Sequence, residues 1–320
     1  MTRAAAPIGL ISNPGSGHNR NQFTRIAERI DRCDYIQHRI TRSTDDILPV
    51  LRDFADAGID TLAINGGDGT ASAVLGQLLE SGLFPTLPHI ALLPGGTANM
   101  NAGDIGVKGK LAAAVNRFCL WCETPERTTP PIAERALLRV ASAAGPVRHG
   151  MFLGGGAIIH GTEYAHENIH SRGLRDDFSL ALGTLRTVWG LSRSDPAFNR
   201  HVPLGISIDG AAPHTLDTVI LVISTLQRLA FGMRPFWSNE PGDVRITVFE
   251  KGCSRFVRTF VSIIRGKPSK NAVPAQGYRS HNANRLDLAL QGDLNLDGEI
   301  FSADGEVTIT ATPKLAFLQL

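Results

Sequence analysis

Short apolar runs alternate with amphipathic stretches along the first 120 residues. The apolar runs of strand length lie at residues 8–12, 35–40, 61–64 and 90–93. Between the first two, Phe23, Ile26 and Ile30 recur at helical spacing. Residues 43–46 resemble a capping box that opens another helix, and residues 110–121 form the last one. This alternation predicts an α/β domain with an open parallel sheet.

The pattern changes after residues 123–131, a proline-containing segment that reads as a linker. Apolar runs then follow one another in series, at residues 136–140, 147–153, 204–208, 218–224, 244–249, 286–290 and 307–311. Only residues 178–191 and 253–265 have helical periodicity among them. Strands in series predict a mostly antiparallel, β-sandwich-like domain, so we expect two domains, 1–130 and 131–311.

Glycine-rich loops follow three strands of the first domain, at residues 13–17, 65–70 and 94–99. The carboxyl ends of parallel strands lie along one edge of an open sheet, where ligands bind. Glycine allows backbone N–H groups to approach phosphate oxygens, and the N-terminus of a following helix adds positive dipole. The first loop matches neither a Walker A motif nor G-x-G-x-x-G. Together the loops predict a site for a phosphate-bearing ligand.

Asp68 lies inside the second of these loops, between glycines. A carboxylate beside phosphates needs a cation between them, and Mg²⁺ is the expected one. The alternative is a tight strand-to-helix turn that carries an incidental aspartate.

The formal net charge of +2 conceals a local imbalance. Residues 251–285 contain eight Lys or Arg and no acid, and residues 225–237 concentrate bulky apolar side chains. A solvated basic face is one interpretation, and an anionic membrane surface is the other. No apolar run has membrane-spanning length and no targeting signal is visible. We expect a soluble, cytoplasmic protein that associates peripherally with membranes and has no nucleic-acid partner.

Two cysteine and histidine motifs have to be weighed as metal sites. Cys119 and Cys122 form a C-x-x-C without a second pair, which favours buried thiols. His166 and His170 have the H-E-x-x-H spacing of zinc peptidases. A third ligand is not apparent, however, and residues 171–173 end that helix. We expect ordinary histidines and no stoichiometric zinc.

The glycine loops at residues 13–17, 66–70 and 93–99, with the late segment 296–299 (Leu-Asp-Gly-Glu), resemble the diacylglycerol kinase catalytic-domain family. This family includes sphingosine and ceramide kinases and shares its nucleotide-binding fold with NAD kinases. The match is closest to soluble bacterial lipid kinases. The resemblance implies that residues 312–320 return to the first domain. It also implies a kinase that uses ATP and Mg²⁺ to phosphorylate a hydroxyl of a long-chain lipid, either diacylglycerol or a ceramide or sphingoid base.

The resemblance further implies one set of residues around ATP and its phosphates. They are Asn13, Ser16, Gly17, Thr41, Gly66, Gly67, Asp68, Gly69, Thr70, Ala71, Ser72, Gly95, Gly96, Thr97 and Asn99. Asp68 would act through Mg²⁺, and Asp297 would be the general base that takes the proton from the lipid hydroxyl. Glu299 would support the metal or the site. Asp304 begins a second Asp-Gly-Glu, but Asp297 has the family's distance from the closing segment.

The chain departs from the family pattern at several positions. Ser72-Ala73 and Asn99-Met100-Asn101 stand where members usually carry Asn-Glu and Asn-Asp-Phe. A second, structural Mg²⁺ site would fall at Glu240 and Asp243, where Pro-Gly replaces the usual Asp-Gly. An NAD kinase and a non-catalytic nucleotide-binding regulator remain alternatives. The lipid, and whether the protein is a monomer or a homodimer, stay open.

Overall fold

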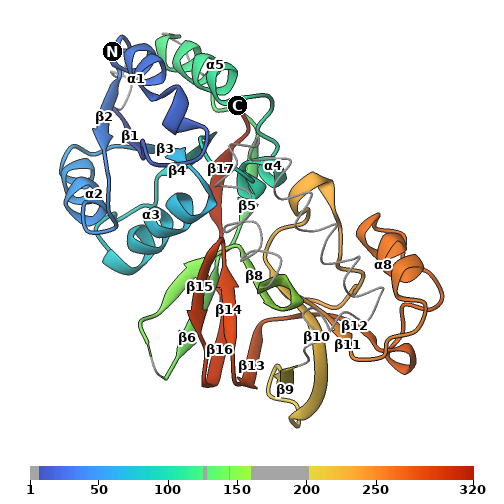
Figure 1. Ribbon diagram of the computed structural model, residues 1–320. Helices are drawn as coiled ribbons and strands as arrows, with labels where there is room; N and C mark the ends of the chain where they lie inside the picture. Colours follow the sequence, from blue (N-terminus) through green and yellow to red (C-terminus); the bar gives the residue numbers. More distant parts are fainter. Residues whose placement is uncertain (1–6, 125–127, 144, 160–201) are drawn as a thin grey trace. The chain divides into compact units, whose positions relative to one another are not determined.

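The computed structural model describes residues 7–124, 128–143, 145–159 and 202–320. The chain divides into two compact units (Figure 1). The first unit is Met1–Arg135 with Lys314–Leu320, and the second is Ala136–Pro313. The first unit extends beyond residue 130 because the strand that follows the linker joins its sheet.

The first unit contains a six-stranded sheet in the order β2-β1-β3-β4-β17-β5. Its strands are β1 (Ile8–Ser12), β2 (Ile36–Ile40), β3 (Thr61–Gly66), β4 (His89–Pro94), β5 (Ile132–Arg135) and β17 (Leu315–Leu318). The ladders from β2 through β17 are parallel, and β5 is antiparallel to β17. The sheet is therefore mixed, with the predicted parallel arrangement interrupted only at the β5 edge.

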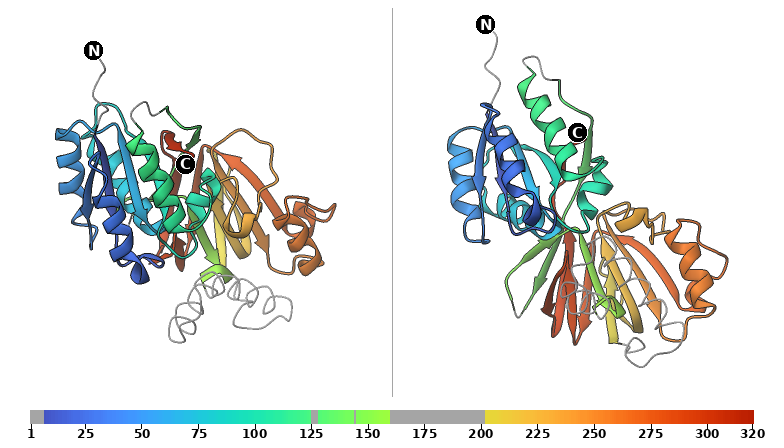
Figure 2. Two further views of the ribbon diagram at one scale, coloured as in Figure 1. Left: turned by 90° about the horizontal axis from the view of Figure 1, so that it is seen from above. Right: turned by 45° about the horizontal axis from the view of Figure 1, so that its top comes forward.

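Helices cover both faces of this sheet (Figures 1 and 2). They are α1 (Phe23–Asp31), α2 (Ile47–Asp56), α3 (Asp68–Ser81), α4 (Met100–Ile105) and α5 (Leu111–Glu123). The α1 and α5 helices pack on one face through Ile26, Ile30 and Phe118, which join Leu10 and Ala63 of the strands in one core. Because β1 and β3 are covered on both faces, they read as continuous apolar runs. The predicted α/β domain is confirmed.

The second unit contains an eleven-stranded sheet in which every ladder is antiparallel. Its strands are β6 (Leu138–Ser142), β7 (Arg148–Gly150), β8 (Phe152–Gly156), β9 (Val202–Ile208), β10 (His214–Ser224), β11 (Val244–Glu250), β12 (Tyr278–Ala283), β13 (Arg285–Leu290), β14 (Asp293–Leu296), β15 (Glu299–Ser302) and β16 (Gly305–Ala311). The order is β15-β14-β8-β10-β9-β13-β16-β6-β7, and β11 pairs with both β10 and β12.

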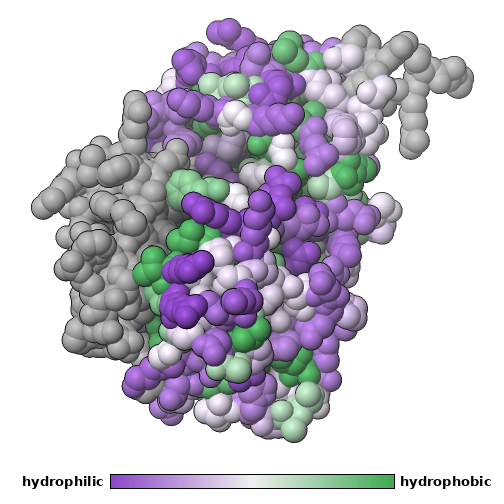
Figure 3. All heavy atoms as spheres, turned by 90° about the vertical axis from the view of Figure 1, so that its right-hand side faces the viewer, coloured by the Kyte–Doolittle hydropathy of each residue, from purple (hydrophilic) through white to green (hydrophobic). Residues whose placement is uncertain are grey.

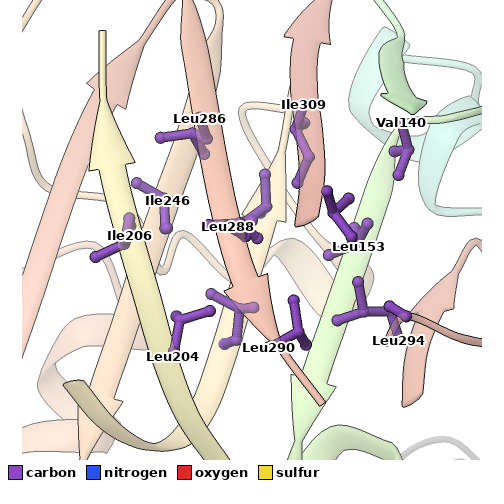
Figure 4. Close-up of a cluster of buried hydrophobic side chains, with 14 of the residues drawn as sticks. Val140, Leu153, Leu204, Ile206, Ile246, Leu286, Leu288, Leu290, Leu294 and Ile309 are labelled. Atoms are coloured by element: carbon purple, nitrogen blue, oxygen red, sulfur yellow. The ribbon is translucent and has the colours of Figure 1, made fainter. Parts of the chain in front are cut away.

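The antiparallel β domain predicted from the strand series is built as one sheet that curls around its own core. Leu286, Leu288 and Leu290 alternate along β13 and point toward apolar side chains of other strands (Figure 4). The β10 strand pairs with β9 along its first half and with β8 along its second. A register shift between Thr218 and Ile220 marks the change, and such bulges bend a strand.

Between residues 202 and 320, the second unit also contains three shorter elements: η3 (Ala230–Gly232), α8 (Phe256–Ile264) and η4 (Pro274–Gln276). The α8 helix confirms the helix predicted at 253–265, although it begins later because Arg255 adopts φ 51°. The predicted helix at 178–191 and the pair His166 and His170 lie outside the described residues. Within the described ranges, no helix has both the length and the apolar character needed to span a bilayer.

The capping box predicted at residues 43–46 is present only in part. The Asp46 carboxylate accepts the backbone N–H groups of Ser43 (2.9 Å) and Arg42 (2.7 Å). The α2 helix begins after Asp46, however, and no side chain caps it at that residue. The four-residue turn therefore precedes the helix instead of forming its first turn.

Candidate functional site

Three loops of the first unit meet at the carboxyl ends of its parallel strands. Loop 1 (residues 13–17) follows β1, loop 2 (residues 66–70) follows β3, and loop 3 (residues 94–99) follows β4. A Cβ added to Gly96 of loop 3 would overlap Cα of Gly67 in loop 2, and one on Gly17 would overlap the Thr97 side chain. Glycine is therefore required at Gly17 and Gly96 because backbones approach closely there.

Polar side chains tie loop 1 to loop 2. Asn13 Nδ2 donates to Thr70 Oγ1 (2.9 Å), and Ser16 Oγ lies 3.2 Å from the same hydroxyl oxygen. The Gly67 N–H donates to Ser16 Oγ (3.3 Å). The structure thus brings together Asn13, Ser16, Gly67 and Thr70, which the family resemblance places around ATP.

Asn19 connects loops 1 and 3 to the end of β3, and sequence reasoning missed it. It is fully buried, and its Nδ2 donates to the carbonyl oxygens of Asn13 (2.8 Å) and Asn65 (3.3 Å). Its backbone N–H donates to the Gly95 carbonyl (3.2 Å). Asn19 opens the 3-10 turn η1 (Asn19–Asn21), where no periodicity distinguishes it from a solvent-exposed residue.

A second network, buried at Ser12 and exposed at Asp31, supports these loops from the strand side. His38 Nδ1 lies 2.7 Å from Asp31 Oδ1, and His38 Nε2 lies 2.8 Å from Ser12 Oγ. Asn65 Nδ2 donates to the same Ser12 oxygen (3.1 Å). Since Ser12 is fully buried, this Ser-His-Asp arrangement is not an exposed nucleophile. It holds the ends of β1, β2 and β3 in register beside the loops.

The Asp68 carboxylate joins loop 2 to the helix that follows loop 3. Its Oδ2 accepts the Met100 N–H and its Oδ1 accepts the Asn101 N–H, each at 3.0 Å. Asp68 opens α3, and Met100 opens α4. Burial raises the pKa of Asp68, while the two N–H donors oppose that rise. The carboxylate is therefore held in one orientation between two helix N-termini.

Asn99 fixes the entry to α4. It adopts a left-handed conformation with φ 48°. Its Oδ1 accepts the Gly96 N–H (2.9 Å), and its Nδ2 donates to the Gly96 carbonyl (2.8 Å). Asparagine tolerates this conformation better than most residues because its side chain bonds locally. The turn presents the Met100 and Asn101 N–H groups to Asp68.

The residues around Asp68 fit a Mg²⁺ ion that is held mainly by other ligands. Each carboxylate oxygen has two lone pairs, so the two N–H bonds leave capacity for a cation. The described ranges contain no cluster of three metal-ligating side chains. Mg²⁺ in phosphate sites usually keeps water and takes one or two carboxylates with phosphate oxygens. A single carboxylate at Asp68 meets that requirement.

Three predicted nucleotide contacts lie below the surface. Thr41, Ala71 and Ser72 are each at least nine-tenths buried. The Thr41 N–H donates to the Ser12 carbonyl (3.0 Å), which ties the end of β2 to β1. Their contact with ATP stays a prediction, and in the structure they support the loops.

The second predicted metal site lies in the second unit. Glu240 accepts hydrogen bonds from Ser238 Oγ (2.9 Å) and the Asn282 N–H (3.1 Å), and it lies 3.1 Å from His281 Nδ1. Asp243 is exposed. Glu240 thus stabilises its own loop, and a structural Mg²⁺ at Glu240 and Asp243 stays a prediction.

Asp297 occupies the turn between β14 and β15 and is only 7% exposed. Its Oδ2 accepts the Met151 N–H (2.8 Å) and its Oδ1 accepts the Phe152 N–H (3.0 Å). Its own N–H donates to the Phe152 carbonyl (2.9 Å), and its φ is 48°. The carboxylate is fixed by two consecutive N–H groups, as at Asp68.

The neighbouring acids differ from Asp297 in their surroundings. Glu299 begins β15 and is exposed. Asp304, the first residue of the second Asp-Gly-Glu, is also exposed and accepts from Ser302 Oγ and the Gly292 N–H, each at 3.3 Å. Of the two aspartates, Asp297 has the rigid, buried setting that a positioned base needs.

The close approach of loops 2 and 3 gives a prediction for Gly96→Ala. The new methyl group would overlap Gly67, so both backbones must separate. If the loops bind ATP, as the resemblance implies, the affinity for ATP should fall at least about tenfold. Gly103→Ala in α4 is the matched control, because a Cβ there meets open space. Equilibrium binding of ATP to both variants tests this, and equal affinities would show that the contact between the loops is not needed.

The glycine loops and Asp68 lie within a segment that matches a known family. Residues 7–125 match the family model described as the diacylglycerol kinase catalytic domain. Proteins named "Probable lipid kinase YegS-like" from Chromohalobacter salexigens and Klebsiella pneumoniae are 32% identical over 110 residues and 28% identical over 120 residues. These alignments cover 33% and 37% of this chain, and 34% and 39% of those proteins. The match thus spans little more than a third of the relatives' length.

Solved structures extend the likeness to the whole fold. A crystal structure of a diacylglycerol kinase from Bacillus anthracis has a TM-score of 0.63 at 17% identity, covering 98% of this chain and 97% of that one. A second crystal structure from the same organism has a TM-score of 0.68 at 18% identity, covering 100% and 99%. At such identities the likeness shows the fold alone. Residues 7–125 are therefore similar in sequence to the diacylglycerol kinase catalytic domain, and the whole chain shares the fold of these solved structures.

Proposed function

We propose that the protein is a kinase that uses ATP and Mg²⁺ to phosphorylate a hydroxyl group of a long-chain lipid. The observation that carries this proposal is the contact of three glycine loops beside a fixed carboxylate, Asp68. The match of residues 7–125 to the diacylglycerol kinase catalytic domain, and the names of the relatives, support a lipid acceptor.

Loop 2 and the start of α3 would bind the phosphates of ATP. The first N–H groups of a helix have no partner within it, and the helix dipole favours an anion there. The N-cap residue of α3 is Gly67, which has no side chain to occupy those donors. Asn13, Ser16 and Thr70 would hold the loops in place through their mutual hydrogen bonds.

Asp68 would be the protein ligand of the cation. When bound, Mg²⁺ supplies the positive charge that offsets the negative charge developing on the transferred phosphoryl group. Burial raises the pKa of Asp68, so cation binding competes with a proton and should weaken as the pH falls. The N–H groups of Met100 and Asn101 favour the ionised carboxylate that the cation requires.

Asp297 would act on the acceptor as the general base. As the lipid hydroxyl oxygen bonds to the γ-phosphorus and ADP leaves, the hydroxyl proton passes to the Asp297 carboxylate. The Met151 and Phe152 N–H groups fix its orientation, and its oxygens retain capacity to accept a proton. Glu299 is exposed two residues later, where it would support the metal or the site.

The acceptor distinguishes this proposal from its alternatives. Purified protein should be incubated with γ-labelled ATP and Mg²⁺ in the presence of diacylglycerol, ceramide, a sphingoid base, NAD or no acceptor. We expect label in a lipid product and none in NADP. Label in NADP alone would identify an NAD kinase. Tight ATP binding without transfer to any acceptor would favour a nucleotide-binding regulator.

A further inference from the structure

The loop between β10 and β11 holds an aromatic side chain outward. Phe231 is 62% exposed and adopts φ 57° and ψ 19°, a left-handed conformation unfavourable for a residue with a Cβ. Backbone hydrogen bonds nevertheless close the turn, from Leu229 N to Met233 O (2.8 Å) and from Gly232 N to Leu229 O (3.0 Å). The ring is therefore displayed by an ordered turn.

This turn is attached to α8. The Arg234 N–H donates to the Ile264 carbonyl (2.8 Å) at the end of the helix. The inner side of α8 is anchored by Phe256 and Phe260, whose rings lie 6.2 and 5.9 Å from that of Phe249. Its outer side exposes Val257, at 47%. The helix is thus firmly packed and still presents an apolar side chain to solvent.

The positive charge around α8 is only partly neutralised. Of the eight cations in residues 251–285, Arg279 pairs with Glu250 (2.6 Å) and Arg285 pairs with Asp287 (2.8 Å). The other six are exposed and have no ion-pair partner in the described part of the chain. They are Lys251, Arg255, Arg258, Arg265, Lys267 and Lys270. We call these six cations, with Val257 and Phe231, the α8 surface.

We propose that the α8 surface docks on an anionic lipid bilayer, with Phe231 inserted at the level of the headgroups and the six cations on lipid phosphates. Seen from the side that carries α8, hydrophilic side chains cover most of the surface and hydrophobic ones form small separate groups (Figure 3). A protein partner would usually require a larger apolar patch. Each Lys or Arg near an anionic membrane strengthens binding roughly fivefold. The six cations can therefore attract the protein to the membrane, and the Phe231 ring can insert into it.

The same loop is connected to Asp297. Ser224 Oγ (2.6 Å) and the Thr225 N–H (3.2 Å), where the loop begins, both donate to the Met151 carbonyl. The Met151 N–H donates to Asp297. The loop that would dock on the membrane and the Asp297 carboxylate are therefore both hydrogen-bonded to the backbone of Met151. This consequence rests on the proposed function, whereas docking itself does not.

Sedimentation with vesicles tests the proposal. The vesicles are pure phosphatidylcholine or a mixture of phosphatidylcholine and phosphatidylglycerol. Phe231→Asn removes the ring while asparagine keeps the left-handed turn, and Leu120→Asn alters another exposed apolar side chain, which lies in the first unit and is 53% exposed. On the anionic vesicles, Phe231→Asn should bind at least about tenfold more weakly than the wild type, and Leu120→Asn should bind equally well. Changing Arg258, Arg265, Lys267 and Lys270 to Gln should reduce the preference for anionic vesicles at least about a hundredfold.

Equal binding of the wild type to both kinds of vesicle, or unchanged binding of Phe231→Asn, would overturn the docking proposal. The proposed function is assessed separately with a short-chain lipid dispersed in detergent, on which Phe231→Asn should be as active as the wild type. If no lipid is phosphorylated in either form, the proposed function fails while the vesicle result still decides the docking.

Discussion

Asp68→Ala should lower kcat at least about a hundredfold while the protein remains folded. The variant lacks the carboxylate that we propose as the protein ligand of Mg²⁺, and losing one such electrostatic group typically costs this much or more. It also leaves the Met100 and Asn101 N–H groups without their acceptor, so α4 should loosen. Steady-state kinetics with Mg²⁺ titration, alongside circular dichroism, measure both effects. Near-normal activity in a folded variant would remove Asp68 from the mechanism.

The pKa of Asp68 gives this prediction a pH dependence. Burial raises the pKa, so Asp68 takes up its proton at a higher pH than an ordinary aspartate, which titrates near about 4. If only the ionised carboxylate holds the cation, kcat/KM should fall as the pH drops through that raised pKa. The free energy of unfolding depends on pH in the opposite direction. The contribution of Asp68 to it is greatest in acid and is lost as the pH rises through the pKa that Asp68 has in the folded protein. Because Mg²⁺ competes with that proton, the acid limb should move to lower pH as the Mg²⁺ concentration is raised, and an acid limb that does not respond to Mg²⁺ would contradict the role.

Asp297→Asn should lower kcat by about a hundredfold or more, because general-base catalysis typically contributes at least that much. The amide keeps the shape of the side chain, but it is not basic. Its Nδ2 cannot accept a hydrogen bond, so one of the two N–H groups of Met151 and Phe152 loses its acceptor. Asp304→Asn is the matched control, since it changes the same kind of residue in the exposed Asp-Gly-Glu and should leave kcat unchanged. Loss of activity in Asp304→Asn alone would move the base to the second tripeptide.

The strand ends could be predicted because the residues that precede the loops are apolar. The four runs of the first domain each became a strand within about two residues of the expected bounds. Strands β12, β14 and β15 were missed, since sequences such as Tyr278–Ala283 are mostly polar and their partly exposed positions leave no apolar run. Pairing in the sheet, which is not local in sequence, outweighs their weak pattern.

The candidate site was predictable at the level of loops and not at the level of hydrogen bonds. Topology places Gly17, Gly67 and Gly96 at one sheet edge, and the structure shows their loops in contact. The bonds from Asp68 to Met100 and Asn101 depend on the left-handed turn at Asn99, which no periodicity indicates. The number of cations in residues 251–285 also overestimates the unpaired positive charge. Arg279 pairs with Glu250 and Arg285 pairs with Asp287, and both acids lie just outside that range.

Phosphoryl transfer to a lipid is tested most directly by the mass of the product formed from ATP whose γ-phosphate carries ¹⁸O. If the acceptor hydroxyl attacks the γ-phosphorus, the lipid should gain one phosphoryl group that retains the label, with the lipid's own oxygen forming the new ester bond. The amount of labelled lipid should match the ADP released and should be lost in Asp68→Ala and Asp297→Asn. Label that appears only in free phosphate or in NADP, with the mass of every lipid unchanged, would contradict a lipid kinase.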